Sequence, residues 1–177
     1  SVKHDARLVA KEYVQEEGVD FEELFVPVAK MESVELPIAL AVQESWKIHH
    51  LDVKSVFLNS ELEGDVYVNQ PPGFIKEGEE HKVLKLHKVL YGLRQGSRAW
   101  SIKLDQTLIS LGFEKAPLEH PMYKRGEVRD RLLVGIYIDD LLITGADEEV
   151  IVKFKLQMKD LFKMDGLGLL TYYPRIE

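Results

Sequence analysis

Hydrophobic positions along this chain follow two spacings, and each spacing predicts a different kind of element. Apolar residues at helical spacing follow Ser33, Ser97 and Asp147, and Ser33 can cap the first of these predicted helices. Short apolar runs predict strands at residues 6–11, 47–53, 66–68, 83–86, 131–138 and 141–144. This mixture predicts an α+β fold, in which helices pack on one face of an antiparallel sheet.

Pro37 conflicts with the first predicted helix, which runs from Ser33 towards Trp46. A proline in a helix interior costs about 3 kcal/mol, because it removes a hydrogen bond and clashes with the preceding turn. A proline in the first turn is tolerated. The helix is therefore predicted either to contain Pro37 or to begin near it.

Composition excludes several classes of protein and site. No cysteine occurs among the 177 residues, which excludes a disulfide framework and a cysteine-ligated zinc site. No apolar run approaches the ~20 residues of a membrane span, so no membrane contact is expected. The net charge of −7 counts against a free-standing nucleic-acid binder. Walker, dinucleotide-binding and nucleophile-elbow motifs are absent from the sequence.

The most distinctive chemistry is the acid pair Asp139-Asp140 between two apolar strands. A two-residue hairpin turn needs residues that tolerate positive φ, and aspartate is one of them, so the pair could simply form the turn. Two adjacent carboxylates nevertheless repel each other and are costly to ionise without a cation. Asp52 lies at the end of another predicted strand. If the two strands pair, three carboxyl groups converge at one edge.

Three converging carboxylates suit Mg²⁺, which binds through one or two carboxylates together with waters and substrate phosphates. Two such ions about 4 Å apart can activate an attacking hydroxyl and stabilise a leaving oxygen, which is the chemistry of nucleotidyl transfer. A zinc site fits less well, because zinc favours clustered histidines. His49 and His50 are adjacent on a strand and should point to opposite faces, so a structural role is expected for both.

Five sequence blocks follow one another along the chain: ARLVAK (6–11) with FVPVA (25–29), LDVKSVFLN (51–59), VYVNQPPGF (66–74), LYGLRQGSRAW (90–100) and YIDDLL (137–142). In content and order they resemble the reverse transcriptase of copia-type (pseudovirus-like) LTR retrotransposons. The resemblance covers nearly the whole chain. It implies a right-hand polymerase in which residues 1–177 form the fingers and palm, with the thumb and RNase H domain outside this stretch.

The same resemblance implies RNA- or DNA-templated DNA synthesis from deoxynucleoside triphosphates, with two Mg²⁺ (or Mn²⁺) ions. Asp52 and Asp139 are implied as the main metal ligands and Asp140 as the third acid. Phe57 is implied to pack under the incoming sugar, where its ring would clash with a 2′-hydroxyl. Contacts with the incoming nucleotide are implied for Gln95, Arg7 and Lys11.

From the residues alone, other interpretations of these four positions remain open. Phe57 could be a core residue, Gln95 a loop residue, and Arg7 and Lys11 part of a solvated strand face. The resemblance further implies partners: an RNA or DNA template-primer, dNTPs, and the rest of the Pol polyprotein with its thumb, RNase H and integrase. It implies an intracellular location in cytoplasmic virus-like particles, with nuclear access of the complex.

Some positions depart from the family's usual residues, namely Glu12, Pro37, Gly96-Ser97, Leu169 and Pro174. None of them is one of the three acids. Together they are typical of a diverged copy, and they leave open a catalytically inactive, truncated remnant of the same family. A remoter alternative is an unrelated α+β binding module, in which the acid pair only forms a turn.

Overall fold

The computed structural model describes residues 8–10, 32–62, 64–93, 95–116 and 122–170. The chain divides into two compact units. Unit 1 comprises Ser1–Val26 and Phe57–Lys103, and unit 2 comprises Pro27–Val56 and Leu104–Glu177. The described α-helices are α1 Glu32–Gln43, α2 Gly96–Ser110 and α3 Glu148–Leu161, and a short 3-10 helix, η2, spans Val56–Asn59. None of these helices is long and apolar enough to cross a membrane.

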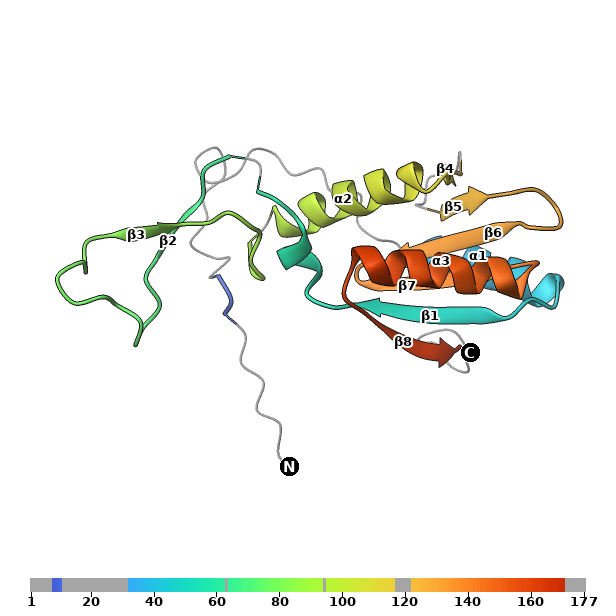
Figure 1. Cartoon of the computed structure of the whole chain (residues 1–177), viewed down its shortest axis with the longest axis horizontal. Helices are drawn as coiled ribbons and strands as arrows, with labels where there is room; N and C mark the ends of the chain where they lie inside the picture. Colours follow the sequence, from blue (N-terminus) through green and yellow to red (C-terminus); the bar gives the residue numbers. More distant parts are fainter. Residues whose placement is uncertain (1–7, 11–31, 63, 94, 117–121, 171–177) are drawn as a thin grey trace, which may run out of the picture. The chain divides into compact units, whose positions relative to one another are not determined.

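Unit 2 is built on a six-stranded sheet with the strand order β4-β5-β6-β7-β1-β8 (Figure 1). Every neighbouring pair in it is antiparallel, which gives the α+β fold that the sequence predicts. The strands are β1 Ile48–Val53, β4 Glu114–Lys115, β5 Met122–Arg125, β6 Leu132–Tyr137, β7 Asp140–Gly145 and β8 Met164–Leu169. The core lies along the central strands, where Leu51, Val134 and Ile143 are fully buried.

Helices cover both faces of this sheet, so the prediction that they pack on one face is wrong. Val34 of α1 packs against Leu142 of β7 on one face. On the opposite face, Lys155 of α3 reaches His49 of β1, and Figure 1 shows α3 and α1 on either side of the strands. The cause is visible in β7, where the run 141–145 is buried at successive positions. A strand that is apolar on both faces needs cover on both.

Sequence signals set the ends of two helices. Asp147 caps α3, and its Oδ1 accepts the backbone N–H of Glu149 at 2.8 Å. Phe154 and Met158 are buried on the inner side of that helix. Gly112 follows α2 with a φ of +82°, a left-handed conformation that glycine adopts without steric cost.

Pro37 lies inside α1, which begins at Glu32, so the alternative in which the helix begins near the proline is wrong. The missing N–H leaves the carbonyl of the preceding turn without its helical partner. Pro37→Ala is expected to raise the free energy of unfolding by about 1–2 kcal/mol, since about 3 kcal/mol of helix cost is relieved and some buried contact is lost.

Thermal unfolding checks this expectation, with a rise in Tm of about 4 °C for a chain of this size. Glu35→Ala is the matched control, because Glu35 is exposed on the same helix and its removal should change stability by less than about 0.5 kcal/mol. A lower Tm for Pro37→Ala would mean that the buried ring contributes more packing than the proline costs in helix geometry.

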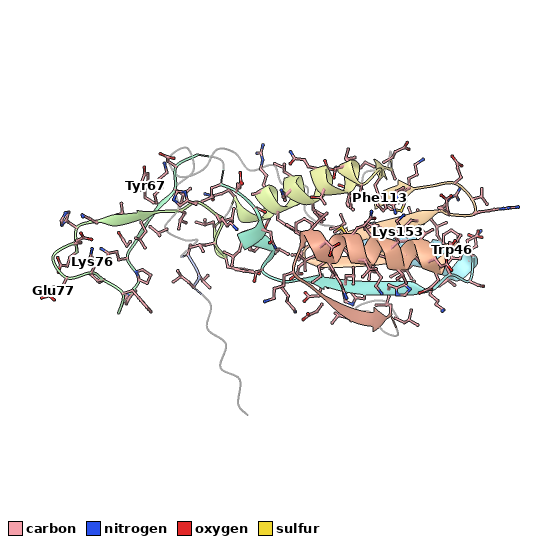
Figure 2. All side chains as sticks on the ribbon, in the orientation of Figure 1. Trp46, Tyr67, Lys76, Glu77, Phe113 and Lys153 are labelled. Atoms are coloured by element: carbon pink, nitrogen blue, oxygen red, sulfur yellow. The ribbon has the colours of Figure 1, made fainter. Side chains whose placement is uncertain are left out.

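Unit 1 contains a two-stranded antiparallel sheet formed by β2 (Tyr67–Asn69) and β3 (Val83–Lys85). Its lysines are paired with acids of the same hairpin: Glu79 lies 3.2 Å from Lys76 and 2.8 Å from Lys82. Figure 2 shows Tyr67 and Lys76 on this hairpin. Residues 65–85 contain four acids and three lysines, so the described hairpin offers no net positive charge to a phosphate backbone.

Candidate metal centre

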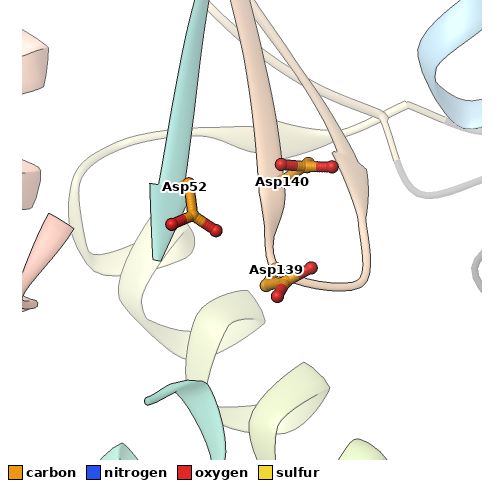
Figure 3. A group of neighbouring side chains, drawn as sticks. All are labelled: Asp52, Asp139 and Asp140. Atoms are coloured by element: carbon orange, nitrogen blue, oxygen red, sulfur yellow. The ribbon is translucent and has the colours of Figure 1, made fainter. Parts of the chain in front are cut away.

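Asp52, Asp139 and Asp140 converge at one end of the unit 2 sheet (Figure 3). β1 and β7 pair with Asp52 directly opposite Asp140. Asp139 lies in the turn between β6 and β7, and its backbone carbonyl accepts the N–H of Val53 at 3.0 Å. One carboxylate oxygen of each acid lies within 4.8 Å of the other two. The strand pairing considered for the sequence therefore brings the three acids together.

The turn beside this site is not made by the acid pair. Tyr137 and Asp140 are cross-strand partners, so the loop residues are Ile138 and Asp139. The positive φ of 59° falls on Ile138, a β-branched residue for which this region is unfavourable. Neither aspartate has a positive φ, and Asp140 begins β7. The need for turn-forming residues therefore does not account for the pair.

The electrostatics of the site disfavour three ionised acids. Burial raises the pKa of the Asp139 carboxyl above its usual value, and the charges of Asp140 and Asp52 raise it further. A hydrogen bond from the backbone N–H of Asp139 and the charge of Lys54 act in the opposite direction, but more weakly than burial. A cation bound between the carboxylates would stabilise their ionised forms.

Two further side chains contact the acids, and Asp165 lies beside them on the neighbouring strand. The Lys54 ammonium donates a hydrogen bond to Asp52 Oδ2 and lies 3.5 Å from Asp165 Oδ2. Asp165 is the partner of Asp52 on β8, so a row of acids crosses β7, β1 and β8. Nε2 of His50 lies 2.6 Å from Oδ1 of Asp140. Sequence reasoning missed these contacts, because they depend on strand register rather than on residue spacing.

His49 and His50 point to opposite faces of β1, as the sequence predicts. His49 is buried, with Nδ1 at 3.1 Å from Nζ of Lys155 and Nε2 at 2.9 Å from Oε1 of Glu148. Burial lowers the pKa of the imidazole, and the positive charge of Lys155 lowers it further. His49 therefore sits under α3, away from the acids, and the two histidines cannot share one metal ion.

The donor set fits a hard divalent cation. All three candidate ligands are carboxylates, and Mg²⁺ and Mn²⁺ prefer such oxygen ligands. Zinc in proteins usually takes nitrogen or sulfur ligands. In the part of the chain that the structure describes, this is the only cluster of three or more potential ligand residues.

The residues implied to contact a nucleotide belong to unit 1 where they are described. The ring of Phe57 packs edge-on against Tyr91, with 4.7 Å between the ring centroids. A Cβ on Gly96 would lie 3.4 Å from the ring of Phe57, so Phe57 adjoins the segment that carries Gln95. The backbone carbonyl of Gln95 accepts a hydrogen bond from the N–H of Ala99 at the start of α2. Phe57 and Gln95 therefore belong to one local cluster.

Arg7 and Lys11 lie outside the described residues. The described residues between them reach the same cluster: Val9 forms a parallel bridge with Tyr91, and the N–H of Ala10 donates to Tyr91 O at 2.7 Å. Gly92 has a φ of +86°, and a Cβ there would lie 2.1 Å from the carbonyl oxygen of Ala10. Only glycine therefore permits this close approach of the two backbones.

Without metal, Asp139→Asn is expected to stabilise the protein at pH 7 by on the order of 1 kcal/mol, the scale of a like-charge pair in a sheet. The folded pKa of Asp139 exceeds the unfolded one, so folding takes up protons between the two values. The free energy of unfolding therefore falls as pH rises from the ordinary aspartate range through the raised value, and the deficit persists at neutral pH.

Thermal melts in EDTA between pH 4 and pH 8 measure this deficit, which corresponds to about 2–4 °C in Tm. Asp160→Asn is the control, because Asp160 is exposed on α3. Mn²⁺ at 100 times its Kd should add about 2.7 kcal/mol to the wild type and clearly less to Asp139→Asn. Identical pH curves for the wild type and Asp139→Asn would contradict this account of the electrostatics.

Comparison with known proteins places the chain among relatives of one kind. Residues 1–177 match the family described as "Reverse transcriptase (RNA-dependent DNA polymerase)". The "Retrovirus-related Pol polyprotein from transposon TNT 1-94" of Nicotiana tabacum is 39% identical over 168 residues, which is 94% of this chain and 13% of that protein. The corresponding polyprotein from transposon RE1 of Arabidopsis thaliana is 37% identical over 175 residues, 99% of this chain and 12% of that protein.

A more distant relative comes from yeast. The "Transposon Ty1-GR3 Gag-Pol polyprotein" of Saccharomyces cerevisiae is 25% identical over 187 residues, covering 97% of this chain and 10% of that protein. The chain thus spans only 12–13% of the length of the two plant polyproteins.

Proposed function

This chain belongs to the reverse transcriptase (RNA-dependent DNA polymerase) family of copia-type retrotransposon Pol polyproteins, and from that membership we propose that it catalyses RNA-directed DNA synthesis by two-metal nucleotidyl transfer. The observation that carries the proposal is the convergence of Asp52, Asp139 and Asp140, whose oxygens lie within 4.8 Å of one another. The family indicates the reaction, which is nucleotidyl transfer, and the three carboxylates would provide ligands for the metal ions that this reaction needs.

The two units correspond, in this proposal, to the palm and fingers of a right-hand polymerase. Unit 2 is the palm, because it carries the three acids at one end of an antiparallel sheet. Unit 1 is the fingers, because it carries Phe57 and Gln95. The proposed partners in the polyprotein are the thumb, RNase H and integrase; this chain spans 12–13% of the length of its plant relatives.

The acids have separate roles in this mechanism. Asp52 and Asp139 hold the metal ions, and Asp140 completes the ligand set. When bound, two divalent ions would favour deprotonation of the primer 3′-hydroxyl and stabilise the charge on the leaving pyrophosphate. Burial raises the pKa of Asp139, and a cation beside this carboxyl would stabilise its ionised form. The Lys54 ammonium occupies one oxygen of Asp52 and has Asp165 as a second partner nearby.

The cluster around Tyr91 would select and hold the incoming nucleotide. Phe57 is half-buried, and its ring is fixed by Tyr91, so it can act as a rigid wall beneath the sugar. The side-chain amide of Gln95 can donate to sugar or phosphate oxygens. Arg7 and Lys11 supply positive charge for the triphosphate.

The proposed partners are an RNA or DNA template-primer, dNTPs and the other domains of the Pol polyprotein. The net charge of −7 is unfavourable for binding a phosphate backbone. It supports the proposal that other segments of the polyprotein provide most of the affinity for the template-primer duplex. The proposed location is the cytoplasmic virus-like particle, with later nuclear access of the complex.

Primer extension tests the proposed function directly. The chain is incubated in excess over an RNA template annealed to a DNA primer, with dNTPs and either Mg²⁺ or Mn²⁺. We expect addition of at least one nucleotide, dependent on the metal ion and directed by the template. Absence of incorporation with either ion, by protein that melts cooperatively, would reject catalysis by this chain and favour an inactive copy of the same family.

A further inference from the structure

His50 lies beside the metal centre on the same face of the sheet as two of its acids. It precedes Asp52 by two residues on β1, and alternate residues of a strand share a face. Asp140 is directly opposite Asp52, while His50 is directly opposite Leu142, so His50 and Asp140 are diagonal neighbours. The diagonal contact is made, because Nε2 of His50 lies 2.6 Å from Oδ1 of Asp140.

This short contact fixes the direction of the hydrogen bond. A bare ring nitrogen and a carboxylate oxygen are both acceptors and would repel at such a distance. When Asp140 is ionised, as a metal ligand is, the proton belongs to the imidazole, and Nε2–H of His50 donates to Oδ1 of Asp140. The two side chains are only 16% and 27% exposed, so water competes weakly for either group.

A carboxylate held in this way has a fixed orientation, and it offers a cation the second oxygen, which the imidazole does not contact. We propose that His50 is a positioning residue of the metal centre: it occupies Oδ1 of Asp140, fixes the plane of the carboxylate and directs Oδ2 towards a divalent cation. This inference rests on the proposed function, since it assigns a partner to one of the three acids. Outer hydrogen-bond partners of ligating carboxylates typically change metal affinity or activity by about 10–100-fold.

His50 differs from the other partner in the site in a way that suits this role. Lys54 brings a full positive charge to Asp52, and that charge competes with a metal ion for the same oxygen. An imidazole N–H can donate from a neutral ring. The bond from His50 to Asp140 can therefore persist when a cation is bound, whereas the Lys54 ammonium is repelled by it.

Binding of Mn²⁺ alone to the 177-residue chain tests the inference, with free Mn²⁺ followed by electron paramagnetic resonance. We expect His50→Leu to weaken binding by about 10-fold or more. His50→Gln should stay within about 3-fold of the wild type, because its amide N–H can still reach and donate to the carboxylate. His50→Asn keeps a polar amide but is too short to reach the carboxylate, so it should weaken Mn²⁺ binding as much as His50→Leu. It therefore replaces His50→Leu in the test if the leucine variant does not fold.

A double-mutant comparison separates positioning from general structure. In an Asp140→Asn background, His50→Leu should cause no further loss of Mn²⁺ affinity, because its partner is already altered. Equal Mn²⁺ affinity of His50→Leu, His50→Asn and the wild type would overturn the inference, as would an equal loss in His50→Gln. If the wild type and every variant fail to bind Mn²⁺, the metal centre of the proposed function is overturned as well.

Discussion

Replacing Asp139 by asparagine is expected to slow primer extension by about 100- to 1000-fold. The substitution keeps the size of the side chain but removes a negative charge from the proposed metal ligands. Metal ions supply several kcal/mol of transition-state stabilisation, and each 1.36 kcal/mol corresponds to a factor of ten in rate. Loss of about 3–4 kcal/mol of that stabilisation therefore gives the stated decrease.

Single-nucleotide incorporation under enzyme excess measures this effect without a contribution from processivity. Asp160→Asn is the matched control, because it removes the same charge from an exposed position on α3. It should retain the wild-type rate within about 2-fold. An Asp139→Asn variant that kept more than about a tenth of the wild-type rate would contradict a role for this carboxylate in holding the metal ions.

Activity and stability should move in opposite directions at this residue. Asp139→Asn is expected to abolish most catalysis and yet to melt at a higher temperature in EDTA. Burial and the nearby like charges raise the pKa of the Asp139 carboxyl, so its ionised form disfavours the metal-free fold. The left-handed backbone of Ile138 adds local strain on the order of 1–3 kcal/mol at the same turn. Proteins commonly keep strained or destabilising residues where their activity needs them, which is the trade-off expected at this turn.

The central elements of the fold could be predicted because their signals are local. Asp147 caps α3, and apolar runs form β6 and β7. β8 was missed, since only Met164 is buried in it and it contains Gly166 and Gly168. Such an edge strand is held by backbone hydrogen bonds to its partner rather than by its own pattern, and residue preferences in strands depend on that context.

The acids of the site could be predicted, whereas their partners could not. Asp139 and Asp140 stand out between apolar strands, and Asp52 lies at the end of a predicted strand that could pair with one of those strands. The contacts of His50 with Asp140 and of Lys54 with Asp165 follow from the register of three strands. A slip of one residue would move every one of these side chains to the other face. No spacing along the sequence encodes that register.

Removing the ring of Phe57 is expected to lower the preference for deoxynucleotides over ribonucleotides by on the order of 100-fold. The ring packs edge-on against Tyr91 and lies beside Gly96, and these contacts restrict its movement away from the proposed position of the sugar. A clash with the Phe57 ring would act only against ribonucleotides, because only they carry the 2′-hydroxyl. Relief of a clash of about 2.7 kcal/mol corresponds to a factor of about 100. Phe57→Ala should therefore raise ribonucleotide incorporation far more than it lowers deoxynucleotide incorporation.

The ratio of kcat/KM for dGTP to that for GTP, on one template-primer, measures this preference. Phe57→Tyr is the matched control, because it retains the ring and should keep the ratio within about 3-fold. Tyr91→Leu removes the ring that packs edge-on against Phe57 and leaves Phe57 unchanged. It should give an intermediate ratio, because a more mobile Phe57 ring excludes the 2′-hydroxyl less well. If Phe57→Ala lowers incorporation of both nucleotides equally, the ring supports the local packing of unit 1 and does not discriminate between sugars.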